Sequence, residues 1–117
     1  MPRRPTPILR FRLLLDAEHA IGPGKADLLD AIAATGSIAA AGRTMGMSYK
    51  RAWQLIDELN HSFAAPLVAS SKGGKRGGGA VLTAMGERVL AAYRAIDYKA
   101  QTALAAELKA LARLLIR

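Results

Sequence analysis

The chain contains no cysteine among its 117 residues. This absence excludes disulfide bonds, thiolate nucleophiles and cysteine-ligated zinc sites, and it fits a reducing compartment such as a bacterial cytoplasm. Histidine is also scarce, because His19 and His61 are the only ones and neither belongs to a set of carboxylates and histidines at metal-ligand spacing. We therefore expect no metal site and no enzyme activity.

Long apolar runs and acidic residues are scarce as well. No stretch approaches the roughly 18 uninterrupted apolar residues that a membrane-spanning helix needs, and Arg10 and Arg12 interrupt the apolar patch near the N-terminus. The sequence therefore predicts neither a membrane span nor a signal peptide. The 9 acidic residues are outnumbered by 17 lysines and arginines, which leaves a net charge of +8. This balance favours a polyanionic partner, either nucleic acid or an acidic membrane surface.

The first part of the chain contains three segments that differ in pattern. Residues 1–7 combine prolines with arginines and are expected to form a flexible basic arm. In residues 8–16 apolar side chains alternate with arginines. A two-residue period of this kind predicts a strand with one solvent-exposed face. Residues 25–35 carry one apolar helical stripe and are followed by Gly36, which predicts a packing helix with a glycine stop.

A helix-turn-helix is predicted in the middle of the chain. Residues 38–45 are rich in alanine, whose small side chain lets two helices cross closely, and Ser37 can cap their first turn. Gly46 can adopt the positive φ that a tight turn requires, and Ser48 can cap the helix that follows. Two short helices joined by a glycine turn are typical of proteins that place the second helix in the major groove of DNA.

The two faces of the helix that follows Ser48 differ in chemistry. Helical projection places six apolar side chains on one side: Tyr49, Ala52, Trp53, Leu55, Ile56 and Leu59. Tyr49 and Trp53 are therefore expected to pack in the core rather than to stack on bases. The other side carries three groups that can donate to base edges, followed by two acids: Lys50, Arg51 and Gln54, then Asp57 and Glu58. We expect the amino-terminal end of this helix to enter the groove first.

A wing is predicted after this pair of helices. Residues 67–69 and 80–83 read as short apolar strands. The tract between them is rich in glycine and carries three cations: Lys72, Lys75 and Arg76. Such a loop can approach DNA phosphates, whereas it lacks the order of glycine, lysine and hydroxyl residues that defines a nucleotide-binding loop. The predicted fold class is mainly α with a small β wing, a winged helix-turn-helix spanning residues 8–83.

The last part of the chain, residues 84–117, reads as one long helix capped by Thr83. Its apolar side chains recur three or four residues apart, and six of them are predicted to form a dimerisation seam: Val89, Tyr93, Ile96, Leu104, Leu108 and Leu111. A helix of about 30 residues extends about 45 Å at 1.5 Å per residue, which is more than so small a domain covers. A homodimer is the simplest interpretation. A helix that binds another protein or a membrane surface is the alternative.

Four pieces of the sequence resemble the N-terminal DNA-binding domain of the ModE family, the molybdate-responsive transcriptional regulators. They are GPGK at residues 22–25, TGSI at 35–38, MSYKRAW at 47–53 and GGGAVLT at 77–83. The resemblance covers roughly residues 8–98. It implies a dimer that binds a palindromic operator and controls genes for molybdate uptake or molybdoenzymes. A nonspecific architectural DNA-binding protein is the alternative.

Residue chemistry and this resemblance together predict the residues that contact double-stranded DNA: Ser37, Arg43, Ser48, Tyr49, Lys50, Arg51, Gln54, Lys72, Lys75 and Arg76. Regulators of this family carry a molybdate-binding Mop domain after the DNA-binding part, and we read no counterpart of it in this sequence. We therefore expect a single-domain form with no cofactor of its own. Three possibilities remain for regulation: no effector, an oxyanion bound elsewhere, or a separate molybdate-binding partner protein.

Overall fold

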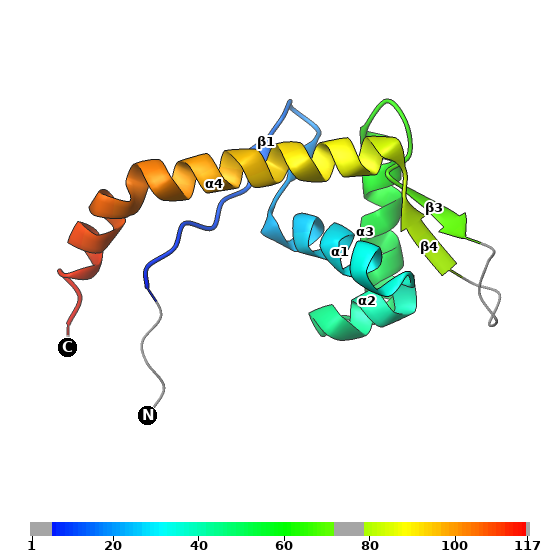
Figure 1. Ribbon diagram of the computed structural model, residues 1–117, viewed down its shortest axis with the longest axis horizontal. Coiled ribbons are helices and arrows are strands. Elements are labelled where there is room, and N and C mark those ends of the chain that lie inside the picture. Colours follow the sequence, from blue (N-terminus) through cyan, green and yellow to red (C-terminus); the bar gives the residue numbers. More distant parts are fainter. Residues whose placement is uncertain (1–5, 72–78, 117) are drawn as a thin grey trace.

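The computed structural model describes residues 6–71 and 79–116. Within this part the chain forms four helices and two antiparallel sheets of two strands each (Figure 1). In chain order the elements are β1 (Leu13–Leu14), β2 (Ala20–Ile21), α1 (Pro23–Thr35), α2 (Ile38–Met45), α3 (Tyr49–Ser62), β3 (Val68–Ser71), β4 (Gly79–Leu82) and α4 (Ala84–Ala112). The predicted winged helix-turn-helix, mainly α with a small β wing, is confirmed.

Local capping sets the boundaries of the helix-turn-helix. α1 ends at Gly36 and α2 ends at Gly46, and both glycines have a φ of 71°, which residues with a Cβ rarely adopt. The side-chain oxygens of Ser37 and Ser48 each accept a 3.0 Å hydrogen bond from the backbone N–H three residues later. The predicted glycine turn and serine caps are therefore confirmed.

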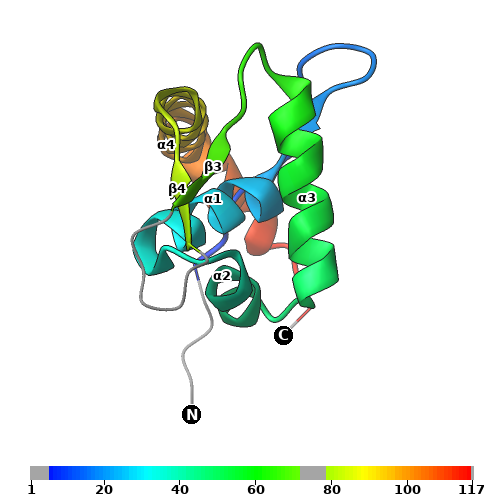
Figure 2. The same cartoon turned by 90° about the vertical axis from the view of Figure 1, so that its right-hand side faces the viewer.

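The hydrophobic core surrounds α1. Figure 2 shows α1 between α3 on one side and the wing strands with α4 on the other. Its largest fully buried side chains are Leu28, Leu29 and Ile32, and they belong to one cluster with Ile56 and Leu59 of α3. Burial of each such side chain contributes about 1.5–3 kcal/mol. This core fixes the direction in which α3 presents its outer face.

The first turn of α4 packs tightly against the chain that enters the wing. The Thr83 hydroxyl donates to the carbonyl oxygen of Pro66 at 2.6 Å and accepts from the N–H of Gly86 at 3.0 Å. The predicted cap at Thr83 is therefore confirmed. α4 covers 29 residues, and its second half extends beyond the body formed by α1, α2 and α3 (Figure 1).

The predicted strand over residues 8–16 is wrong over most of its length. Only Leu13–Leu14 pair in a sheet, and their partner is the two-residue strand Ala20–Ile21. Ahead of β1 the backbone runs along α4 instead of along another strand (Figure 1). The sequence pattern did reveal which side chains face the protein, but it carried no information about which element receives them.

Side chains of α4 take the place of a neighbouring strand for this N-terminal segment. The N–H of Leu9 donates to Oε1 of Gln101 at 2.9 Å, and the Tyr93 hydroxyl donates to the carbonyl oxygen of Phe11 at 3.1 Å. Leu9 and Phe11 are half-buried, whereas the arginines that alternate with them are exposed. The alternation therefore reflects a segment attached to a helix, not a strand.

Candidate nucleic-acid interface

The outer face of α3 is polar and exposed at its amino-terminal end. Lys50, Arg51 and Gln54 are all exposed, whereas Ala52 between them is fully buried in the core. All three exposed side chains carry N–H donors, and Arg51 and Gln54 can each make two hydrogen bonds to one base edge. A helix that exposes this combination at its start has the chemistry to read DNA in the major groove.

Small residues hold α2 close behind α3. Gly42 is buried, and a Cβ added to it would lie 3.4 Å from Cβ of Ala52 and 3.4 Å from the carbonyl oxygen of Met47. The N–H of Met47 donates to the carbonyl oxygen of Gly42 at 2.9 Å, which closes the turn. The close crossing predicted from the small side chains is present, and it sets the angle at which α3 leaves the protein surface.

Seven members of the predicted DNA-contacting set lie in the described part of the chain, at the N-cap of α2, on α2, in the turn or on the first half of α3. Figure 2 shows how α2 and α3 are arranged. Arg43, Ser48 and Tyr49 are exposed, and Ser37 is half-buried at the start of α2. The predicted wing cations fall outside the described residues: Lys72, Lys75 and Arg76. The described candidates thus all belong to the helix-turn-helix, from the N-cap of α2 to Gln54 of α3.

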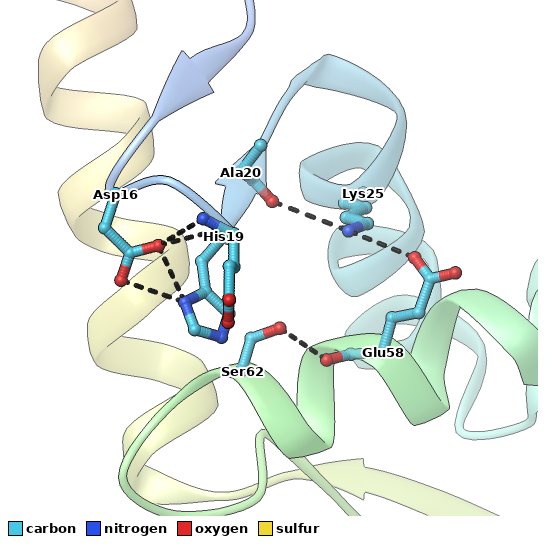
Figure 3. Close-up of polar contacts among 7 residues, drawn as sticks. Asp16, His19, Ala20, Lys25, Glu58 and Ser62 are labelled. Carbon is cyan, nitrogen blue, oxygen red and sulfur yellow. Dashed lines mark hydrogen bonds and ion pairs between the residues drawn. The ribbon is translucent and has the colours of Figure 1, made fainter.

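The carboxyl-terminal end of α3 is acidic, and part of its charge is paired. Oε1 of Glu58 lies 3.3 Å from Nζ of Lys25 on α1 (Figure 3). Nearby, in the loop between β1 and β2, Asp16 accepts a 2.8 Å hydrogen bond from Nδ1 of His19, which lowers the pKa of Asp16. Carboxylates at this end would repel phosphates, so the charge distribution along α3 favours an approach to DNA through its amino-terminal end.

Across residues 6–71 and 79–116, histidine, aspartate and glutamate side chains do not gather in a group of three that could hold a metal ion. No helix in the described part of the chain is long and apolar enough to cross a membrane.

The predicted core packing of Tyr49 and Trp53 is wrong. Their side chains are 57% and 44% exposed, and Nε1 of Trp53 donates a 2.6 Å hydrogen bond to the Tyr49 hydroxyl oxygen. The buried residues of α3 are Ala52, Leu55, Ile56 and Leu59. The face that meets the core is therefore narrower than helical projection suggests, and the two aromatic residues lie at its edge.

A groove of about 380 Å³ lies between this edge of α3 and the wing. Its lining includes Ser37 of the α2 cap, Tyr49 and Trp53 of α3, and Ser70 and Ala80 of the wing strands. Elements that are distant in sequence thus meet around one surface depression. The groove adjoins the exposed start of α3, where the predicted base-reading side chains lie.

Asn60 fixes the wing relative to α3 and is not among the residues predicted from the sequence. Its Oδ1 accepts from the N–H groups of Leu67 and Val68 at 2.8 and 3.0 Å, and its Nδ2 donates to the carbonyl oxygen of Val68 at 3.2 Å. The available signal was an amide that directly follows the apolar stripe of α3. An amide at that position can bond to the backbone of the loop beyond the helix.

The predicted dimerisation seam on α4 needs one correction. Tyr93 is only 3% exposed, and its burial in the core of its own chain raises the pKa of its hydroxyl. No surface of Tyr93 is left for a partner helix, so it does not belong to the seam. The other five residues differ in exposure: Val89 and Leu108 are half-buried, whereas Ile96, Leu104 and Leu111 are 44%, 40% and 66% exposed.

Comparison with known families identifies the region that contains this interface. Residues 25–87 match the family described as bacterial regulatory helix-turn-helix protein, lysR family. This chain belongs to that family. The matched region runs from α1 to the first turn of α4, so it includes α2, α3 and the wing of this lysR-family domain.

Curated relatives of this lysR-family chain have names that refer to molybdenum. The chain is 52% identical to the molybdenum-pterin-binding protein MopB of Rhodobacter capsulatus over 77 residues, and these residues make up 66% of this chain. It is 40% identical over 97 residues to the molybdenum transport protein ModE of Azotobacter vinelandii, covering 83% of this chain. It is 45% identical over 71 residues to the DNA-binding transcriptional dual regulator ModE of Escherichia coli K12, covering 61%.

These matches confirm the resemblance to ModE-type proteins. They also show that the resemblance covers only part of the length of those proteins. The matched region corresponds to 28%, 36% and 27% of the length of these three relatives, in the same order. The chain therefore spans about a third or less of the relatives that it matches. The likeness does not extend over the whole length of these relatives.

Proposed function

We propose that this chain is a ModE-like transcriptional regulator that binds duplex DNA sequence-specifically and controls genes of molybdate uptake or of molybdoenzymes. The observation that carries the proposal is the exposed start of α3, where Lys50, Arg51 and Gln54 project from a helix that packs against α1 and α2. Membership of a regulatory helix-turn-helix family supports DNA binding, and the names of the relatives support the link to molybdenum. A regulator of this kind acts where the DNA is, in the cytoplasm.

We propose further that the chain acts as a homodimer on a palindromic operator. The second half of α4 extends beyond the body of the domain (Figure 1), and Ile96, Leu104 and Leu111 of this helix are exposed. They are spaced 8 and 7 residues apart, so they form one stripe along the helix. A second copy could cover this stripe with its own α4, which would set two α3 helices about one turn of DNA apart or a multiple of it.

The molybdate response belongs to the same proposal. The partners that we propose are duplex DNA and a second copy of the chain. Three possibilities remain for the molybdate response: no effector, an oxyanion bound elsewhere, or a separate molybdate-binding protein. No cofactor is assigned to this chain itself.

Selection of duplexes from a random library at about 0.15 M salt tests the proposed function. Positive charge alone binds any duplex, whereas readout of bases or DNA shape enriches one sequence. We expect enrichment of a palindrome with two half-sites. Tight binding that weakens steeply with salt but enriches no sequence would indicate an architectural DNA-binding protein instead, and absence of duplex binding would contradict the proposal.

Replacement of Arg51 with alanine should relax specificity at one base position of each half-site. Loss of a bidentate contact to a base edge weakens binding to the preferred sequence by about 1–3 kcal/mol and leaves binding to sequences altered at that position nearly unchanged. Gln54→Ala should act in the same way at a different position. The measurement is the dissociation constant on the selected duplex and on a set of single-base variants.

Arg113→Ala is the matched control for this prediction. Arg113 is exposed at the end of α4, so its replacement removes the same charge away from α3. We expect it to lower the affinity for all sequences slightly and equally. If Arg51→Ala behaves like this control, Arg51 contacts the DNA backbone and does not read bases.

A further inference from the structure

Two large aromatic side chains on the outer edge of α3 have no role in the core. Tyr49 and Trp53 are one helical turn apart, and the 2.6 Å hydrogen bond between Trp53 Nε1 and the Tyr49 hydroxyl oxygen locks them into a single unit. Aromatic residues with a polar atom are favoured where one end meets protein and the other meets a partner. Their exposure of 57% and 44% leaves such a surface free.

The direction of this hydrogen bond leaves one donor unused. An indole N–H can only donate, so the Tyr49 oxygen must be the acceptor, and the hydroxyl proton of Tyr49 is free to bond elsewhere. Within residues 6–71 and 79–116 this hydroxyl has no acceptor. A hydroxyl that accepts one hydrogen bond becomes a stronger donor in another, because the two bonds polarise each other.

The groove beside the aromatic pair suits a phosphodiester backbone. The polar residues of its lining are Ser37, Tyr49, Trp53, Asn60 and Ser70, and the other lining residues are apolar or glycine. No carboxylate is present among these residues to repel an anion, and the exposed cations Lys50 and Arg51 adjoin Tyr49 in sequence. Nδ2 of Asn60 uses one of its two N–H groups to donate to the carbonyl oxygen of Val68, and Oδ1 of Asn60 accepts from the N–H groups of Leu67 and Val68.

We propose that the Tyr49 hydroxyl donates to a backbone phosphate of duplex DNA seated in this groove, and that Trp53 is the positioning residue that orients it. When α3 lies in the major groove and the wing contacts the neighbouring part of the duplex, one strand passes between them, which is where the groove lies. The inference deepens the proposed function and depends on it. Because a phosphate carries no sequence information, this contact contributes affinity and register but not specificity.

A double-mutant cycle with Tyr49→Phe and Trp53→Phe tests the inference on the selected duplex. Tyr49→Phe should weaken binding about fivefold to tenfold on all sequences alike. The slope of affinity against salt concentration should stay unchanged, because no cation is lost. Trp53→Phe should weaken binding by a smaller factor, and the double variant should bind no more weakly than Tyr49→Phe alone. Additive losses would overturn the positioning role of Trp53.

Tyr98→Phe provides the matched control for the tyrosine change. Tyr98 is 72% exposed on α4, so its replacement makes the same chemical change away from the groove. We expect its affinity for DNA to equal that of the wild type. If Tyr49→Phe also binds like the wild type, the proposed phosphate contact is absent.

Replacement of single phosphates by uncharged methylphosphonates tests the contact without altering the protein. One position in each half-site should weaken the wild type and leave Tyr49→Phe unaffected. Equal loss in both proteins at every position would contradict the contact. Trp53 is the only tryptophan in the chain, so its fluorescence provides a second readout. DNA should protect it from acrylamide, and unchanged quenching would argue against occupation of the groove.

The outcomes separate this inference from the proposed function. A wild-type chain that binds no duplex contradicts the proposed function, and the inference fails with it. A wild type that selects a palindrome, together with a Tyr49→Phe variant of equal affinity, overturns the phosphate contact alone.

Discussion

Replacement of Gly86 with alanine should lower the free energy of unfolding by about 3 kcal/mol. A Cβ added to Gly86 would overlap the carbonyl oxygen of Leu67 and would lie 3.1 Å from its carbonyl carbon. That carbonyl cannot move freely, because its oxygen accepts a 2.9 Å hydrogen bond from the N–H of Thr83. The first turn of α4 would have to shift away from the wing. Thermal unfolding should show a midpoint roughly 10 °C or more below that of the wild type.

Gly24→Ala is the control for the Gly86 prediction. Gly24 also lies in the first turn of a helix, α1, but a Cβ added to it would meet no atom within 4 Å. Alanine has the higher helix propensity, so this variant should be more stable by up to about 1 kcal/mol. A Gly86→Ala variant that unfolds at or above the wild-type temperature would show that α4 does not pack so closely on the chain entering the wing.

Replacement of Leu104 with aspartate should convert the proposed dimer into monomers and weaken binding to a palindromic duplex by about a hundredfold or more. The introduced charge would have to be buried between two copies of α4, which is strongly unfavourable without a partner. Separate monomers also lose the gain that linked binding to two half-sites provides, about 10²–10⁴ in affinity. Equilibrium sedimentation checks the oligomeric state, and titration of the selected duplex checks the affinity.

Thr102→Asp is the matched control on the same helix. Thr102 is exposed and lies two residues from Leu104, so its side chain points to nearly the opposite side of α4. It introduces the same charge but should leave both the dimer and the affinity intact. A wild-type chain that sediments as a monomer at tens of micromolar would contradict the dimer itself.

The helix-turn-helix could be predicted closely because its signals are local. Ser37 and Ser48 cap the two helices, and Gly46 has the positive φ that its position in the turn requires. A cap or a left-handed glycine depends on interactions within about four residues, so the chain itself contains the information. The candidate base-reading residues Lys50, Arg51 and Gln54 could be predicted from the same local signals. The cap at Ser48 fixes where α3 begins, and helical periodicity then places these residues on the outer face.

The errors concern positions whose partners are distant in sequence. The alternation around Phe11 predicts a strand, whereas the carbonyl oxygen of Phe11 accepts a hydrogen bond from the hydroxyl of Tyr93, 82 residues away. Tyr93 was assigned to a surface seam for the same reason, although the N-terminal segment and the core cover it. Tyr49 and Trp53 were assigned to the core because periodicity indicates a helical face but not its width.

The sequence by itself determined the class of the fold, the bounds of α2, the caps of α3 and α4, and the resemblance to ModE-type proteins. These depend on local hydrogen bonding, on glycine conformation and on short motifs. Only the tertiary structure decided that residues 8–12 lie along α4, that Asn60 ties the wing to α3, and that the aromatic pair faces a groove. The physical reason is that packing depends on which surfaces meet across long separations in sequence, and periodicity marks a surface without identifying its partner.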